Sequence, residues 1–149
     1  MHPASARTQL QLDHQLCFAM YSASLAMTRL YKPLLDDLRI TYPQYLVMLA
    51  LWERDDLMVS ELGAQLSLDS GTLTPLLKRL EASGLVSRLR DAADERRVRI
   101  SLTGAGRNLK VRAAGIPDCL IAATRWPKTE LIALTRQIQD LRDRVKAAA

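Results

Sequence analysis

The sequence predicts a mainly α-helical protein with a small β-wing, a winged helix-turn-helix that carries dimerisation helices at its N- and C-terminal ends. Leucines at helical spacing within residues 69–82 are followed by two extended runs, at 85–90 and 98–102. A helix followed by a two-stranded ribbon is the pattern of a winged helix. Long apolar stripes on either side of this segment predict helices that pack across a two-fold axis.

The helix at the centre of this pattern, here called the reading helix, can be capped by Asp69 or Ser70 and should stop at Gly84. Its apolar stripe consists of Leu73, Leu76, Leu77 and Leu80. Its other face is short, polar and cationic, with Gly71, Thr72, Thr74, Pro75, Lys78, Arg79 and Ala82. Such a face suits a DNA groove lined by base edges and phosphates.

The two extended runs predict an antiparallel hairpin, the wing. Its second run alternates apolar Val98, Ile100 and Leu102 with polar residues, and the tip DAADERR ends in arginines. From Lys78 to Arg99, seven basic residues stand against four acidic ones. This local surplus favours a nucleic-acid partner. The alternative is an ordinary α+β fragment with a solvated charged run.

Helices are also predicted on both sides of the reading helix. After a polar, mobile tail (residues 1 to about 11), Asp13 should cap a helix that runs to about Asp36, and its stripe is Leu16, Met20, Ala23, Met27, Leu30 and Leu34. A second helix, with a Thr41–Gln44 capping box, runs to Glu53 and turns Leu46, Leu49 and Ala50 inward. Val59, Leu62 and Leu66 mark a short third helix.

The C-terminal part predicts two further helical stretches. Thr103 should cap a helix that Gly115 and Pro117 bend or break, and Pro127 lies in the first turn of a last helix with the stripe Leu131, Leu134, Ile138, Leu141 and Val145. We therefore expect one domain over residues 1–149. Its DNA-binding part is about 41–103, its dimerisation helices are about 12–36 and 104–146, and the assembly is a homodimer.

The composition excludes several classes of protein. The chain has 149 residues, 48% of them apolar, and a net charge of +5. The N-terminus does not look like a signal peptide and no apolar run of 18 residues occurs, so a cytoplasmic protein without a membrane partner is expected. Two cysteines and two histidines without metal-site spacing predict no metal. With no phosphate loop, HExxH or GxSxG motif, neither a cofactor nor an enzyme is expected.

Several long motifs carry a resemblance to a known family. VSELGAQLSLDSGTLTPLLKRLEASGLVSR followed by DERRVRISLTGAG resembles the MarR family of winged-helix repressors. LCFAMYSAS and LRITYPQYLVMLALWE resemble its organic-hydroperoxide-resistance regulators. The resemblance covers about Leu16 to Gly106. It implies a repressor that binds palindromic operator DNA as a dimer and is released when Cys17 is oxidised by organic hydroperoxide.

Cys17 lies near the start of its helix, where the helix dipole favours a thiolate, although a free cysteine is commonly an inert apolar residue. The resemblance implies that two tyrosines, matching Tyr31 and Tyr42, donate hydrogen bonds to the thiolate. Tyr31 lies 14 residues beyond Cys17, about 21 Å along a helix. It can therefore reach only the Cys17 of an antiparallel partner. The alternative for both tyrosines is interface packing.

Cys119 matches the class of these regulators in which a second cysteine closes an intersubunit disulfide. No local motif marks this residue, and a plain core cysteine is the alternative.

The expected DNA contacts come from the reading helix and the wing. They are Ser70, Thr72, Thr74, Lys78, Arg79, Arg88, Asp94, Arg96 and Arg97. The resemblance places the family's DERR motif on Asp94 to Arg97, with Arg96 reaching into the minor groove and Asp94 bracing the wing.

Three other functions compete with the peroxide-sensing repressor. The first is a repressor released by a small aromatic ligand, with structural cysteines. The second is a winged helix used for protein contacts. The third is a peroxide-reducing enzyme, for which the sequence shows no turnover machinery.

Overall fold

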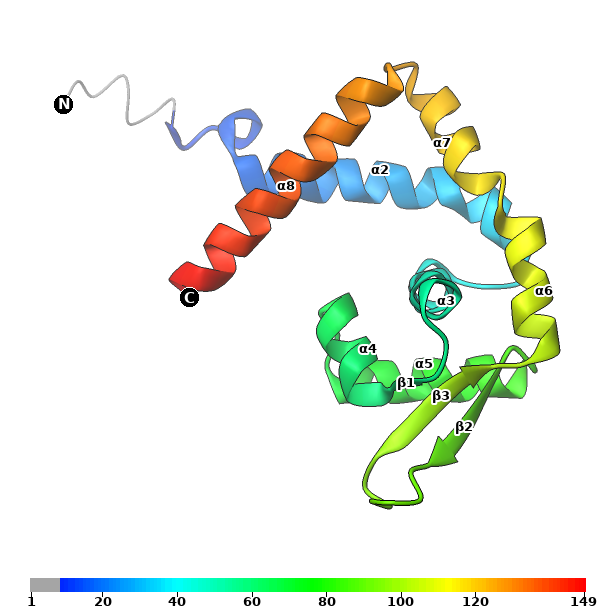
Figure 1. Ribbon diagram of the computed structural model, residues 1–149. Helices are drawn as coiled ribbons and strands as arrows, with labels where there is room; N and C mark the ends of the chain where they lie inside the picture. The colour runs from blue at the N-terminus through cyan, green and yellow to red at the C-terminus, as the bar shows by residue number, and fades with distance from the viewer. Residues whose placement is uncertain (1–8) are drawn as a thin grey trace. The chain divides into compact units, whose positions relative to one another are not determined.

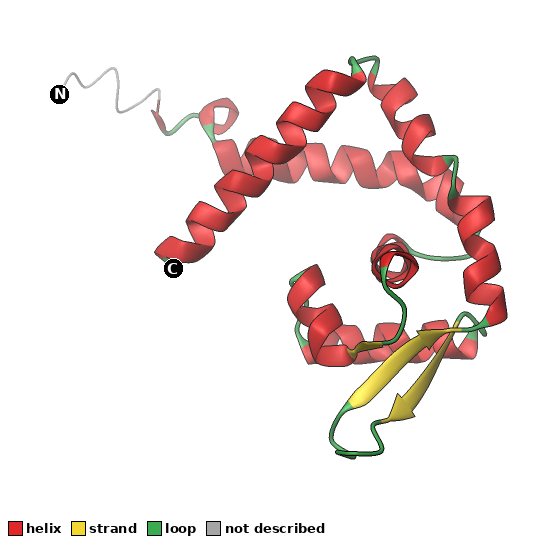
Figure 2. Cartoon of the chain, viewed as in Figure 1, coloured by secondary structure: helices red, strands yellow, loops and turns green. Residues whose placement is uncertain are grey.

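A computed structural model describes residues 9–149. Figures 1 and 2 show helices together with a small antiparallel sheet, as predicted. The chain separates into two compact units that divide between Arg112 and Ala113. Each unit is described by itself, and the single domain over residues 1–149 stays a prediction. Most of the predicted N-terminal tail, residues 1–8, lies outside the described residues.

The first unit contains nearly all of the elements. In chain order they are η1 (Leu12–His14), α2 (Leu16–Asp36), α3 (Tyr42–Glu53), β1 (Leu57–Met58), α4 (Val59–Leu66), α5 (Ser70–Ala82), β2 (Val86–Arg90), β3 (Val98–Leu102) and α6 (Gly104–Ala113), whose last residue already belongs to the second unit. The largest fully buried side chains all lie between Val47 and Ile100. The core of this unit therefore belongs to the winged-helix part.

The start of α2 differs from the prediction. Asp13 does not cap this helix, because it lies in the 3₁₀ turn η1, whose last N–H, from His14, bonds the carbonyl of Gln11 at 3.1 Å. The chain is extended again at Gln15, and α2 begins only at Leu16. The prediction that Asp13 is the N-cap of this helix is therefore wrong. Cys17 is consequently the second residue of the helix.

Helix α3 confirms its predicted start and corrects its predicted buried face. Thr41 and Gln44 form the capping box, with distances of 2.9 and 3.3 Å. Leu49, however, is 40% exposed and Leu46 is only half-buried. The buried residues are Gln44, Tyr45, Val47, Met48, Ala50 and Leu51. Because this helix is apolar on most of its faces, periodicity alone could not identify the inner one.

The reading helix is α5, and its predicted signals are confirmed. The carboxylate of Asp69 accepts the N–H of Thr72 at 2.7 Å, and these hydrogen bonds hold the pKa of Asp69 below its ordinary value. The four predicted leucines are buried. Gly84 has a φ of 77°, the left-handed conformation that ends many helices.

The wing is a hairpin of β2 and β3, and β1 adds a third strand in the order β1-β3-β2. In β2–β3, Val86 is opposite Leu102 and Arg90 is opposite Val98. Strand β1 pairs Leu57 with Ile100 and Met58 with Arg99. Sequence reasoning missed β1, because two residues are too few to show a period.

A close approach at Gly106 joins α6 to the rest of this unit. A Cβ at this position would collide with the carbonyl oxygen of Leu85, and the indole N–H of Trp52 donates to the Gly106 carbonyl at 2.9 Å. We expect Gly106→Ala to lower the free energy of unfolding by about 1–3 kcal/mol through overpacking. Urea denaturation measures this. The matched control is Gly104→Ala in the first turn of the same helix, where a Cβ meets nothing within 4 Å. Equal stability of the two variants would contradict this account.

The second unit contains α7 (Ile116–Thr124) and α8 (Lys128–Ala148). The predicted interruption at Gly115 and Pro117 is confirmed, because α6 ends at Ala113 and α7 begins at Ile116. The stripe of α8 is largely exposed, with Leu134, Ile138 and Val145 at 38%, 43% and 59%. Apolar residues of α2, in the first unit, are also exposed: Leu16, Tyr21, Leu25 and Met27. Exposed stripes of this kind mark interaction surfaces, and the homodimer stays a prediction.

Over residues 9–149, no helix has both the length and the apolar character that a membrane crossing requires.

Candidate nucleic-acid interface and redox site

The polar face of α5 is accessible to solvent. Ser70, Thr72, Lys78 and Arg79 are exposed, and Thr74 is half-buried. Fixed by the Asp69 cap and the buried leucines, this face has a defined orientation. Hydroxyl groups and cations are the kinds of side chain that contact base edges and phosphates in protein–DNA complexes.

A groove with a volume of about 460 Å³ runs between α4, α5 and the wing. Its floor is apolar and includes Leu73, Leu77 and Val98. Five of the predicted DNA contacts lie along it, namely Ser70, Thr74, Arg88, Arg96 and Arg97. The fold thus brings the reading helix and the wing arginines to one cationic concavity, whereas Thr72, Lys78, Arg79 and Asp94 are not among its lining residues.

Asp94 organises the tip of the wing. Its carboxylate accepts the backbone N–H of Arg96 at 3.0 Å and lies 3.4 and 3.7 Å from the Nε atoms of Arg96 and Arg97. The predicted pairing of Asp94 with a nearby arginine is therefore present. The side chain of Arg96 is nevertheless 93% exposed. An ion pair so exposed contributes little energy, so the guanidinium is free to exchange it for a phosphate or a base edge.

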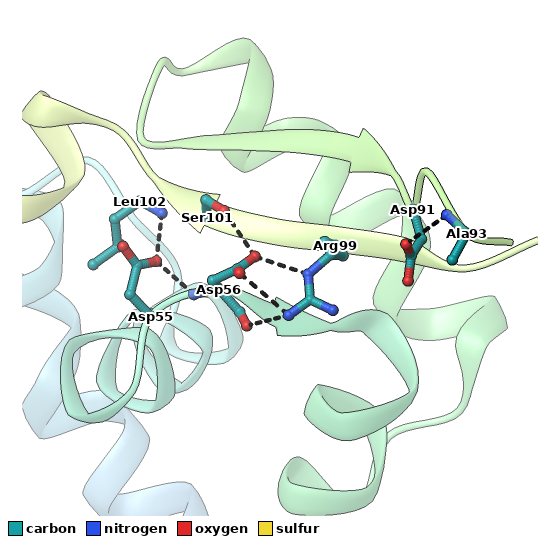
Figure 3. Close-up of polar contacts among 7 residues, drawn as sticks. All are labelled: Asp55, Asp56, Asp91, Ala93, Arg99, Ser101 and Leu102. Atoms are coloured by element: carbon teal, nitrogen blue, oxygen red, sulfur yellow. Dashed lines mark hydrogen bonds and ion pairs between the residues drawn. The ribbon is translucent and has the colours of Figure 1, made fainter. Parts of the chain in front are cut away.

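A second group of acidic residues holds the base of the wing, and sequence reasoning missed it (Figure 3). Asp55 and Asp56, the aspartate turn, connect α3 to β1 and bond to Arg99, Ser101 and Leu102 of β3. The hydrogen bond and charge of Arg99 hold the pKa of Asp56 below its ordinary value. Asp56 in turn raises the pKa of Arg99. A pair of adjacent acidic residues before a short strand was the only signal available in the sequence.

Tyr31 of α2 and Tyr42 of α3 lie together, with ring centroids 4.9 Å apart. Tyr45, which was not predicted as a site residue, lies 5.8 Å from Tyr31. Burial, followed by the neighbouring phenols, raises the pKa of Tyr31 to about 12, and burial also raises the pKa of Tyr42. Both phenols therefore stay protonated at neutral pH and can donate a hydrogen bond to an anion.

Both cysteines are free thiols and exposed. Cys17, as the second residue of α2, lies among the backbone N–H groups that have no partner inside the helix. Because α2 is continuous from Leu16 to Asp36, Tyr31 lies about 21 Å along the helix axis from Cys17. One protomer therefore keeps the thiol apart from the tyrosine pair. Cys119 is the fourth residue of α7, in the second unit.

Metal-binding side chains do not converge in the part of the chain from residue 9 onward. No group of three or more histidine, cysteine, aspartate or glutamate side chains there could hold an ion.

Comparison with known proteins agrees with this architecture. The sequence model of the transcriptional regulators SarA and Rot matches residues 29–112. The organic hydroperoxide resistance transcriptional regulator of Bacillus subtilis (strain 168) is 52% identical over 122 residues, which are 82% of this chain and 83% of that protein.

Solved structures of one regulator give the same result. Reduced AbfR bound to DNA has a TM-score of 0.81 at 35% identity, over 95% of this chain and 97% of that one. Disulfide-formed AbfR has a TM-score of 0.65 at 35% identity, over 94% and 98% of the two chains. AbfR comes from Staphylococcus epidermidis. The chain therefore belongs to the MarR-type winged-helix transcriptional regulators, in the group that contains the organic hydroperoxide resistance regulators.

Proposed function

We propose that this protein is a peroxide-sensing repressor, which binds palindromic operator DNA as a homodimer and leaves it when an organic hydroperoxide oxidises Cys17. The observation that carries the proposal is an exposed thiol at the start of α2, in a chain 52% identical to an organic hydroperoxide resistance regulator. A DNA partner implies a cytoplasmic location. The known relatives are regulators, and we propose no catalytic turnover.

The redox site of this proposal is shared between two protomers. The N–H groups at the start of α2 stabilise a sulfur anion, and the hydroxyls of Tyr31 and Tyr42 donate to it from the partner subunit. The thiolate attacks the terminal oxygen of the hydroperoxide and the O–O bond breaks. Cys17 becomes a sulfenic acid, and the alkoxide leaves and takes up a proton to form an alcohol. The sulfenic acid no longer offers the tyrosines an anionic acceptor.

DNA binding in this proposal uses the two-fold symmetry of the dimer. The two α5 helices enter successive major grooves about 10 bp apart. The predicted contacts are Ser70, Thr72, Thr74, Lys78 and Arg79 from the helix, and Arg88, Arg96 and Arg97 from the wing. The ligand-sensing alternative is not favoured, since the relative with 52% identity is named for hydroperoxide resistance and AbfR has been solved reduced on DNA and with a disulfide.

The test uses a duplex that the protein itself selects from a random DNA library. Footprinting should show two symmetric half-sites on one face of the duplex. Binding should fall after one equivalent of cumene hydroperoxide, and mass spectrometry should place the first added oxygen on Cys17. A single unsymmetrical half-site, or binding unchanged by full oxidation of Cys17, would refute the proposal.

Arg96 gives a separate test of the wing. We expect Arg96→Ala to weaken binding and to reduce the slope of log affinity against log salt by about 1, because the variant has one protein cation fewer in contact with the DNA. The matched control is Arg136→Ala on α8, which removes the same charge outside the winged-helix part. A slope equal to that of the parent would mean that the wing tip does not contact DNA.

A further inference from the structure

The wing depends on a short attachment to the rest of the first unit. Strands β2 and β3 pair with each other over five residues each. Strand β1 contributes two residue pairs, Leu57 with Ile100 and Met58 with Arg99. A hairpin joined by so short a strand can tilt about its base unless other bonds fix its direction.

The aspartate turn supplies such bonds directly before β1 (Figure 3). A carboxylate oxygen of Asp55 accepts the backbone N–H of Leu102 at 2.8 Å. The carboxylate of Asp56 accepts the Nε and a terminal nitrogen of Arg99, at 3.0 and 3.2 Å. The same terminal nitrogen also donates to the Asp56 carbonyl at 3.2 Å, and the hydroxyl of Ser101 donates to the carboxylate at 3.2 Å.

The backbone of Asp56 is held in an uncommon conformation by this arrangement. Its φ of 61° lies in the left-handed region, which aspartate and asparagine tolerate better than most residues. A two-pronged bond between a carboxylate and a guanidinium fixes direction as well as distance. The side chains of Arg99 and Asp56 are 36% and 56% exposed, and ion pairs so exposed contribute little to stability. Orientation therefore accounts for these bonds better than folding energy does.

We propose that Asp56 and Arg99 are positioning residues, which fix the angle of the wing to α5 so that Arg96 reaches DNA. This inference rests on the proposed DNA-binding function. Arg99 lies on β3, three residues beyond Arg96, and its guanidinium is occupied by Asp56. The Arg96 guanidinium makes one hydrogen bond to Asp94, whereas that of Arg99 makes three to Asp56, so the proposal gives Arg99 a positioning role and no phosphate contact.

Charge and geometry predict opposite results for Asp56→Asn. The substitution removes a negative charge from a protein that binds a polyanion, which by electrostatics alone should strengthen binding. Asparagine keeps the size of the side chain and tolerates the left-handed backbone. If the ion pair positions the wing, affinity for the selected duplex should instead fall about tenfold, the effect of one lost charge-assisted hydrogen bond. Arg99→Lys keeps the charge, loses the two-pronged geometry, and should weaken binding in the same direction.

Glu53→Gln is the matched control. Glu53 lies three residues before Asp56, exposed at the end of α3, and its side chain has no hydrogen-bond or ion-pair partner within residues 9–149. The Glu53→Gln protein loses the same charge without losing a side-chain bond, so its affinity for the selected duplex should equal or exceed that of the parent.

A double-mutant cycle with Arg96 separates positioning from general damage. If Asp56 acts by presenting Arg96, then Asp56→Asn should have little further effect on a protein that already carries Arg96→Ala. Additive losses, unchanged affinity in Asp56→Asn, or a loss that merely follows the unfolded fraction by circular dichroism would overturn the inference. Failure of the unaltered protein to select any duplex would instead refute the proposed function.

Discussion

Cys17→Ser protein should remain on its DNA at hydroperoxide concentrations that release the parent completely. Serine keeps the size of the side chain but supplies no thiolate, which is the group that attacks peroxide. Its hydroxyl can still accept hydrogen bonds from Tyr31 and Tyr42 of the partner, so binding without oxidant should stay close to that of the parent. Fluorescence anisotropy of a labelled duplex, titrated with cumene hydroperoxide, measures both quantities.

The matched control for this prediction is Cys119→Ser, the same atomic change at the other exposed cysteine. Its first oxidation should still occur on Cys17. Normal release of Cys17→Ser protein by hydroperoxide would mean that Cys17 is structural, and the ligand-sensing alternative would then take precedence.

The geometry of α2 means that a single protomer cannot form the proposed sensor. Tyr31 and Tyr42 lie in contact, whereas Cys17 and Tyr31 are separated by about 21 Å along the continuous helix α2. In the proposed dimer, a second copy binds to the exposed apolar residues of α2 and α8 and brings its tyrosine pair to Cys17. Oxidation at such a site changes contacts between subunits. Its effect can therefore reach the spacing of the two reading helices.

Local signals predicted most of the fold. The Thr41–Gln44 box, the Asp69 cap and Gly84 each act within a few residues, and the structure contains all three where they were expected. The prediction that Asp13 caps α2 was wrong, because an acidic residue close to a helix start can lie in a preceding turn as easily as at the cap. The prediction that Leu49 faces inward was wrong, because the apolar pattern of a helix that is apolar on most faces does not identify its buried face.

The site was less predictable, because its contacts join residues far apart in the sequence. Asp56 and Arg99 are separated by 43 positions, and no periodicity relates them. Tyr45 joins Tyr31 and Tyr42 only after α3 has packed against α2. The Arg96 and Asp94 assignments, by contrast, came from a contiguous motif. Sequence motifs thus identified groups that act locally, while the groups that orient them required coordinates.

Peroxide should also produce a covalent dimer, and we expect this dimer to require Cys119. After Cys17 becomes a sulfenic acid, attack by the Cys119 thiolate of the partner subunit forms an S–S bond and releases hydroxide, which is protonated to water. Both thiols are exposed in the reduced protomer, so neither needs to leave a core to react. The relative AbfR, which has been solved in a disulfide-formed state, supports this proposal.

On a non-reducing gel, the parent should shift from monomer to dimer after hydroperoxide treatment and return with dithiothreitol. Cys119→Ser should give no dimer, and mass spectrometry should find its Cys17 oxidised without a partner. A disulfide requires Cα atoms within about 7 Å, so any greater separation in the reduced dimer forces the first and second units of the two chains to move. Such a movement changes the half-site spacing that the two α5 helices can match, and this is why the bridged dimer should lose its DNA. A dimer that forms equally well in Cys119→Ser protein would instead assign the bridge to two Cys17 residues, and Cys119 would then take no part in the switch.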